Sequence, residues 1–220
     1  MGRKLKKDMK EQARTELLPK ILPQDKFYWV WIDAKGGYLG VDTSSNSKAC
    51  DVLGVLRTCL NFEPAITRFQ TALSPSALMG DWLAAGSGSE DFSIDDQCEL
   101  VEQVKRKGVV RYSRHNLCVN EVKQHLAAGK IVKKLGMTFA DMVSVVLTDV
   151  LELKSVKFLE VKTEDYSSPG DGADDVFDAE LLFMAGTLAK LLDALLSELG
   201  EGEGEEEGGD GQDSPEKEAA

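Results

Sequence analysis

The sequence predicts an α+β fold in which antiparallel β-sheets are flanked by helices. Short runs of β-branched and aromatic residues follow one another closely and are separated by turn signals, which is typical of hairpins and meanders. Segments with an apolar residue every three or four positions lie between and after these runs, and they indicate amphipathic helices. With 220 residues, of which 42% are hydrophobic, the chain is long enough for one or two domains with a core.

The first ninety residues predict a helix, a hairpin and two further helices. Residues 3–18 form a charged helix that ends before Pro19, because proline cannot continue a helix. The run FYWVWID at 27–33 predicts a buried strand, AKGG a turn, and YLGVD a partner strand. The segment TSSNS offers N-caps for a helix over 47–60, and a short helix with Leu78 and Trp82 follows Pro75. Residues 84–90, AAGSGSE, predict a loop.

The second half predicts a three-stranded meander and a long helix. A strand over 109–113 precedes a short helix, with Asn120 as its N-cap and Gly129 just past its end. Three strands follow within 130–160, then a loop. The C-terminal amphipathic helix over 175–199 has two apolar rows and only a narrow polar stripe, so two of its sides should be buried. Either both sides pack against the chain's own sheet, or one side meets a second subunit.

These elements divide the chain into four parts. Residues 1–26 are a basic helix with a proline-rich connector, and residues 27–90 form a ββα-type subdomain. Residues 91–200 form a C-terminal α+β domain with the meander and the long helix. Residues 201–220 contain almost only Gly, Glu, Asp and other polar residues, which predicts a disordered acidic tail.

Positive charge gathers in one block, although the chain has a formal net charge of −12. Residues 105–134 hold nine Lys or Arg residues against one carboxylate, Glu121. Cations that folding brings to one surface can bind the phosphates of a nucleic acid, whereas scattered ones merely balance acidic residues elsewhere. The candidate DNA-binding residues are Lys105, Arg106, Lys107, Arg111, Arg114, Lys130, Lys133 and Lys134.

Motifs of catalysis are mostly missing from the sequence. The two His and four Cys residues have no zinc-ligand spacing, and neither a phosphate-binding loop nor a G-x-S-x-G motif is present. We therefore predict no metal, no cofactor and no enzyme activity. A metal-dependent nuclease remains an alternative, because Asp33 and Asp42 at the ends of the hairpin strands, or the acidic residues between Asp91 and Glu99, could hold Mg²⁺. No export signal or membrane span is predicted, which favours the cytoplasm.

Several segments resemble the bacterial recombination-associated protein RdgC family. They are RKLKK, WIDAKGGYLGVD, ACDVLGVLRTCL, HLAAGKIVKKLGMTF, LKSVKFLE and FDAELLFMAGTLAKLLDALLSELG, in family order from Arg3 to Gly200. The resemblance implies a cytoplasmic, nucleoid-associated protein that binds double-stranded DNA with little sequence preference; binding to single strands is left open. It implies a homodimeric ring that limits RecA-driven strand exchange by occupying DNA, without a cofactor, membrane or small-molecule substrate. Two DNA-contact positions of the family fall on Arg114 and Lys130.

The chain also departs from the family pattern. Typical members carry about a third more sequence before RKLKK, which puts closure of the ring in doubt, and the acidic tail is longer than usual. One alternative is therefore a truncated interaction protein that pairs with a full-length relative. A further hypothesis is that the tail competes with DNA for the basic surface; a purely solubilising tail is the other interpretation.

Overall fold

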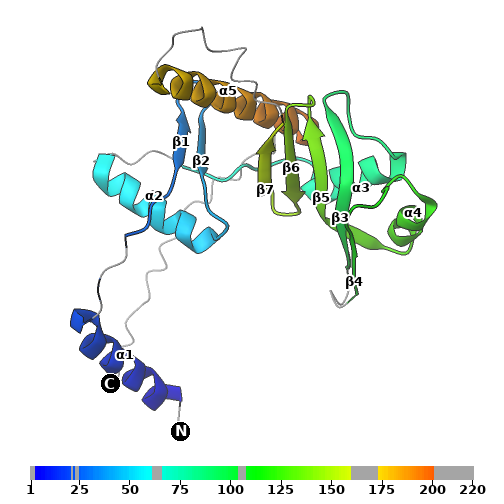
Figure 1. Ribbon diagram of the computed structural model, residues 1–220. Helices are drawn as coiled ribbons and strands as arrows, with labels where there is room; N and C mark the ends of the chain where they lie inside the picture. Colours follow the sequence, from blue (N-terminus) through cyan, green and yellow to red (C-terminus); the bar gives the residue numbers. More distant parts are fainter. Residues whose placement is uncertain are drawn as a thin grey trace, which may run out of the picture. The chain divides into compact units, whose positions relative to one another are not determined.

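The computed structural model describes residues 3–20, 22, 25–60, 66–103, 108–159 and 173–200 (Figure 1). The chain divides into two compact units, each described separately. One comprises Met1–Ile32 and Leu39–Phe62, and the other Asp33–Tyr38 and Glu63–Ala220. The predicted acidic tail lies outside the described residues. The α+β prediction is confirmed, with helices beside one two-stranded and one five-stranded antiparallel sheet.

The first unit contains helices α1 (Arg3–Leu17) and α2 (Asn46–Leu60) and a short 3-10 helix, Leu18–Lys20. The strands β1 (Val30–Asp33) and β2 (Tyr38–Val41) form the predicted hairpin, whose tip belongs to the other unit. None of the described residues between 3 and 60 is buried. Large apolar side chains such as Phe27 (93% exposed) and Trp29 (74% exposed) face solvent instead.

The second unit is built on five strands in the spatial order β4-β3-β5-β6-β7, all antiparallel. They are β3 (Phe92–Glu102), β4 (Val109–Tyr112), β5 (Lys130–Phe139), β6 (Val143–Thr148) and β7 (Leu153–Phe158). Helix α3 (Pro75–Ala85) precedes the sheet, α4 (Asn120–Ala127) joins β4 to β5, and α5 (Ala173–Leu199) ends the described chain. The predicted meander over 130–160 is thus β5, β6 and β7.

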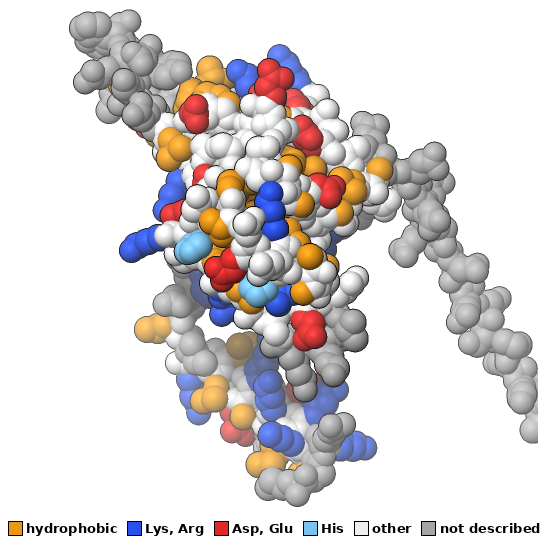
Figure 2. Space-filling model, turned by 90° about the vertical axis from the view of Figure 1, so that its right-hand side faces the viewer, with side chains coloured by type: hydrophobic (Ala, Val, Ile, Leu, Met, Phe, Trp, Pro, Cys, Tyr) orange, Lys and Arg blue, Asp and Glu red, His pale blue; other side chains and the backbone are white. Residues whose placement is uncertain are grey.

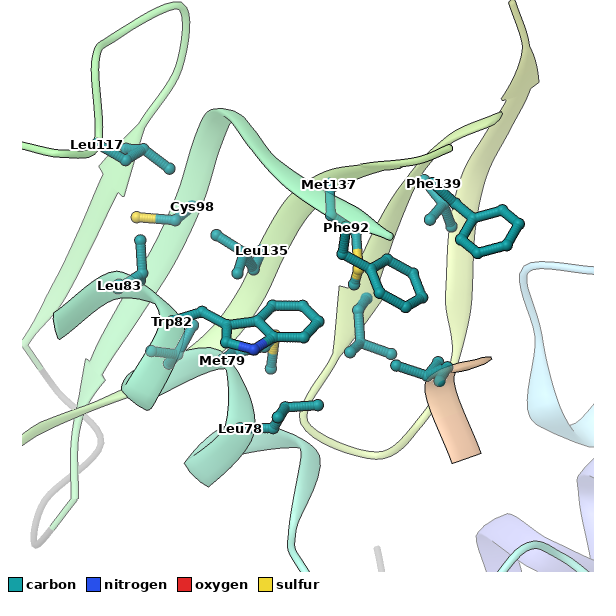
Figure 3. Packing of buried hydrophobic residues seen from close by; sticks show 14 of the residues in the cluster. Leu78, Met79, Trp82, Leu83, Phe92, Cys98, Leu117, Leu135, Met137 and Phe139 are labelled. Atoms are coloured by element: carbon teal, nitrogen blue, oxygen red, sulfur yellow. The ribbon is translucent and has the colours of Figure 1, made fainter. Parts of the chain in front are cut away.

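One face of this sheet, here called the core face, packs against α3, α4 and the C-terminal half of α5. Alternate residues of the strands, such as Leu135, Met137 and Phe139, point towards α3 (Figure 3). Phe92 stacks between Trp82 of α3 and Phe139, with ring centroids 5.4 and 5.2 Å apart. This apolar packing supplies the main stabilisation of the unit, since each buried large side chain contributes about 1.5–3 kcal/mol.

Helix α5 divides into two halves with different surroundings. Leu191, Leu195 and Leu199 are buried in the core, and the end of the helix is tied down by a hydrogen bond from the Leu73 backbone N–H to the Leu199 carbonyl. In the first half, Phe177 and Leu182 are exposed. The prediction that one side of the helix meets a second subunit stays a prediction for this half.

Strand β3 was absent from the sequence-based expectation, which treated 91–99 only as an acidic cluster. Its alternation is interrupted at Asp95, Asp96 and Gln97, because the register with β5 shifts between Ile94 and Cys98. An insertion of this kind is a β-bulge, and it breaks the period of two by which a strand is found in a sequence.

The predicted N-cap of α4 was also wrong. Asn120 is the first residue of the helix, and Val119 occupies the N-cap position without a side-chain hydrogen bond. The loop is organised instead by Asn116, whose Oδ1 accepts a hydrogen bond of 2.9 Å from the backbone N–H of Cys118. Gly129 does lie just past the helix, at φ = 81°, a conformation that glycine adopts readily.

Candidate nucleic-acid interface

The second face of the five-stranded sheet, here called the open face, points away from α3. In Figure 1 its strands lie in front of α3. The register places four basic side chains on this face, one each from β4 and β5 and two from β7: Arg111, Lys134, Lys154 and Lys157. Two of them, Arg111 and Lys134, belong to the predicted set.

Arg111 and Lys134 are held by a carboxylate between them. Glu99 of β3 pairs with Arg111 of β4 on one side and with Lys134 of β5 on the other. Its Oε2 accepts hydrogen bonds from Arg111 Nε at 3.0 Å and from Lys134 Nζ at 3.1 Å. The Glu99 side chain is 10% exposed, whereas that of Arg111 is 72% exposed, so the guanidinium can still meet a ligand.

The ionisation of Glu99 reflects two opposing effects. Burial alone would raise the pKa of this carboxyl, but the hydrogen bonds and positive charges of Arg111 and Lys134 outweigh burial and keep the pKa below its ordinary value. Glu99 is therefore ionised at neutral pH. One carboxylate thus offsets one of the two cations and fixes both at neighbouring positions of the sheet.

Lys154 and Lys157 are further cations of the open face that the sequence reasoning missed. Three positions apart, they would lie on opposite faces of a regular strand. A β-bulge between Lys154 and Lys157 brings them to the same face: they pair with Val146 and Ser144, and Ser155 has φ = 52°. Lys154 forms an ion pair of 2.8 Å with Glu152; within the described residues, Lys157 forms none.

Asp95 is the second carboxylate of the open face, and it is occupied by hydrogen bonds. Its two oxygens accept from Thr138 Oγ1 at 2.8 Å and from Ser144 Oγ at 2.9 Å. Gly136 makes room for this bulge, because a Cβ at that position would lie 2.6 Å from Gln97 Cγ and 3.3 Å from Asp95 Cβ. The side chains of Asp95 and Gln97 thus occupy the space that a side chain at position 136 of β5 would need.

The remaining predicted cations lie elsewhere. Lys130 pairs with Glu102 at the end of the sheet where β3 connects to β4, and its Nζ turns towards His125 of α4. Lys133 is exposed at the register shift of β5. Arg114 lies in the loop after β4, with φ = 55°. Lys105, Arg106 and Lys107 belong to the β3–β4 connection and lie outside the described residues.

The described basic residues therefore do not form one continuous wall. Seen from the side of α4, Lys and Arg side chains emerge at separate points among acidic, apolar and His side chains (Figure 2). Of the predicted DNA-binding residues, the open face contains Arg111 and Lys134. It also contains Lys154 and Lys157 of β7, which were not predicted. Lys130 lies towards the α4 side of the sheet.

Three of the carboxylates considered for a nuclease, Asp33, Asp95 and Glu99, have other partners. Asp33 Oδ1 accepts hydrogen bonds from the backbone N–H groups of Lys35 and Gly36 at 2.9 and 3.0 Å, which stabilises the hairpin turn. Within the part of the chain that the structure describes, no three His, Cys, Asp or Glu side chains are placed to hold a metal ion. Nuclease activity is an untested alternative; its test is Mg²⁺-dependent cleavage that Asp33→Ala or Asp42→Ala abolishes.

The fold and this surface define an α+β protein whose central sheet has one packed face and one cation-bearing face. The chain belongs to the RdgC family: the family model described as "Putative exonuclease, RdgC" matches residues 1–202. Among the described helices, none is long and apolar enough to cross a membrane.

Proteins with the name "Recombination-associated protein RdgC" are similar along most of the chain. The protein of Dechloromonas aromatica is 39% identical over 202 residues, and those of Bordetella parapertussis and Cupriavidus necator are 37% and 39% identical over 199 residues. Each match covers 90% of this chain and 66% of the relative. The chain thus spans about two thirds of the length of these relatives.

Proposed function

We propose that this protein binds double-stranded DNA through the open face of its sheet. Bound there, it modulates homologous recombination by occupying DNA and limiting RecA-driven strand exchange. This assignment is supported by the family, whose members are named for recombination, and by the basic side chains of the open face. The proposed place of action is the cytoplasm, on nucleoid DNA.

The observation that carries the proposal is the register of the sheet. It brings basic side chains from β4, β5 and β7 to one face, although their positions in the sequence range from 111 to 157. Lys and Arg bind phosphate oxygens through charge-assisted hydrogen bonds, and such contacts carry no sequence information by themselves. We therefore expect affinity for the DNA backbone with little discrimination between sequences.

The test is the salt dependence of binding to a fluorescein-labelled duplex, followed by fluorescence anisotropy. If the open face neutralises about four phosphates, it contributes a slope of about −3.6 to log affinity against log salt. The quadruple variant Arg111→Gln, Lys134→Gln, Lys154→Gln, Lys157→Gln should lose most of this contribution, on unrelated sequences alike.

A matched control separates local contacts from overall charge. The variant Lys4→Gln, Lys6→Gln, Lys7→Gln, Lys10→Gln removes the same charge from α1, whose lysines are exposed. We expect its slope to stay closer to that of the unmodified protein. Equal losses in both variants would mean that net charge alone governs binding, and an unchanged slope in the open-face variant would refute the proposed interface.

The first half of α5 is the proposed contact with a second copy of the chain. Phe177, Leu181 and Leu182 form an exposed apolar group there, with Leu182 76% exposed. Apolar stripes of this kind are usually covered in an assembly. Sedimentation should show a dimer that Leu182→Glu weakens, while Glu180→Lys, at a half-buried position on the same helix, serves as a charge control. A dimer insensitive to Leu182→Glu would place the contact elsewhere.

A second candidate function is that of an interaction protein, and the exposed first unit favours it. No described side chain between 3 and 60 is buried, and a two-stranded hairpin is only marginally stable by itself. Native mass spectrometry of this chain mixed with the Dechloromonas aromatica relative should then show a mixed complex. Trp29→Ser should weaken that complex if the hairpin takes part. If the unmodified chain and Trp29→Ser form mixed complexes of equal stability, the hairpin is excluded from the contact.

A further inference from the structure

The acidic tail, residues 201–220, carries most of the excess negative charge of the chain. It contains nine Asp or Glu residues against Lys217, which gives it a formal net charge of −8 within a chain of −12. It contains no aromatic or branched apolar residue, so it has no side chain that could anchor in a core. The family match ends at residue 202, so nearly all of the tail lies beyond it. Charge is therefore the property through which the tail can act.

The point from which the tail starts is fixed by contacts of the second unit. The backbone N–H of Ala72 donates a hydrogen bond of 3.1 Å to the carbonyl of Gly200, the last residue before the tail. Four residues further on, in α3, Ser76 Oγ donates a hydrogen bond of 2.7 Å to the carbonyl of Val132 on β5. The tail thus begins on the core-face side of the sheet, close to the part of β5 that carries Lys134.

The tail is long enough to pass around an edge of the sheet to the open face. Strand β5 has two strands on either side, so each edge is about 10 Å away at the usual strand spacing, and a packed layer adds about 10 Å. The route from the core-face side to the open face is thus about 30 Å. A chain of 20 residues spans at most about 70 Å when extended, and a Gly-rich one about 25 Å on average.

The open face presents cations above carboxylates that lie deeper in the sheet. The Arg111 side chain is 72% exposed, whereas that of its partner Glu99 is 10% exposed. Lys157 is exposed, and within the described residues it forms no ion pair. Carboxylates accept charge-assisted hydrogen bonds from Lys and Arg just as phosphates do. A carboxylate of the tail and a phosphate of DNA would therefore use the same donors and exclude each other.

We propose that the acidic tail docks on the open face of its own chain and competes there with the DNA backbone. Because the tail is tethered, its concentration at the open face is in the millimolar range. If this concentration exceeds the dissociation constant of the docked tail about fourfold, the face is free in about one fifth of the molecules, and DNA binds about fivefold more weakly. As a regulation of DNA binding, this inference rests on the proposed function.

The docking can be tested without DNA by NMR on the full-length chain. The neutral-tail variant replaces every Glu of residues 201–220 by Gln and every Asp by Asn, so length and glycine content stay the same. At low salt, the amide resonances around Arg111, Lys134 and Lys157 should differ between this variant and the unmodified protein, and those around Ala84 of α3 should not. Unchanged spectra, or differences confined to residues outside the open face, would overturn the proposal and leave the tail as a solubilising segment.

Affinity for a fluorescein-labelled duplex gives a second readout. The neutral-tail variant should bind about fivefold more tightly at about 50 mM salt, and this gain should shrink towards about 300 mM because salt screens the docked tail. When combined with the four open-face substitutions, tail neutralisation should gain much less, whereas the α1 control substitutions should leave the fivefold gain intact. Equal gains in both backgrounds would mean that the tail acts through overall charge, which would refute docking. Absence of DNA binding in every variant would refute the proposed function, while the spectra without DNA still decide the docking.

Discussion

The two faces of the five-stranded sheet come from the same strands but differ in what they hold. On β5, Leu135, Met137 and Phe139 face α3 and are buried. Lys134 and Thr138 on the same strand face the other way and bind Glu99 and Asp95. The core face is continuous and apolar, whereas the open face is a set of cross-strand polar pairs.

The difference also appears in how the strands deviate from regular geometry. The core-face residues keep their alternation through most of β5 and β6. The bulges of β3 and β7 change which polar side chains reach the open face, and they place Asp95, Lys154 and Lys157 there. The fold therefore depends mainly on regular alternation, while the candidate interface depends on irregularities. Substitutions on the core face should therefore lower stability, whereas substitutions on the open face should weaken DNA binding.

The largest expected effect is a contrast between neighbours on β5. Leu135→Ala removes a fully buried side chain and should lower the free energy of unfolding by about 2–5 kcal/mol. Lys134→Met keeps an aliphatic stem of similar length and leaves Arg111 paired with Glu99, so it should cost less stability than Leu135→Ala, but it should weaken DNA binding. Urea denaturation and anisotropy on both variants measure the contrast. Similar losses of stability would mean that the two faces are not energetically distinct.

A smaller effect on stability is expected where the bulge of β3 packs against Gly136 of β5. Gly136→Ala brings a Cβ within 2.6 Å of Gln97 Cγ, so the bulge must shift, at a cost of about 1–3 kcal/mol. Gly186→Ala on α5 is the control, because no atom lies within 4 Å of its added Cβ. Since alanine favours helix, that variant should be more stable by about 0.5–1 kcal/mol. Thermal unfolding of both variants checks the opposite signs.

The smallest predicted effect is the contribution of Glu99 as a function of pH. Its pKa in the folded state is lowered, so the carboxylate stabilises the fold above its ordinary pKa of 4.5, and this contribution disappears as pH falls through the lower folded value. Glu99→Gln should therefore be less stable than the unmodified protein at pH 7. Unfolding free energies from pH 7 to 3 should show the difference shrinking in the acid range. A difference that grows towards pH 3 would contradict the assigned ion pairs.

Much of the fold could be predicted from the sequence because its elements follow regular periods. The 3–4 spacing of α5 and the alternation in β5 and β6 identify these elements directly. Strand β3 could not be found in this way, because three polar residues at its bulge interrupt the pattern. The N-cap of α4 was misplaced because the side chain of Asn116, not that of Asn120, bonds the backbone of the loop.

The candidate interface was less accessible to sequence reasoning, since it depends on pairing between strands. Charge counting finds Arg111 and Lys134, but not the carboxylate of Glu99 that holds them. It also passes over Lys154 and Lys157, which a regular strand would place on opposite faces. Cross-strand register and bulges determine these positions, and neither follows from local spacing.

The most direct test of the central claim is to ask where a bound duplex lies. Val146 is on the open face, between Gly136 and Lys154 in the register, whereas Ala84 is an exposed residue of α3, behind the core face. A photo-crosslinking p-benzoylphenylalanine at position 146 should attach to labelled duplex DNA, and one at position 84 should not. Crosslinking from position 84 alone, with both proteins folded and DNA bound, would contradict the assignment of the open face.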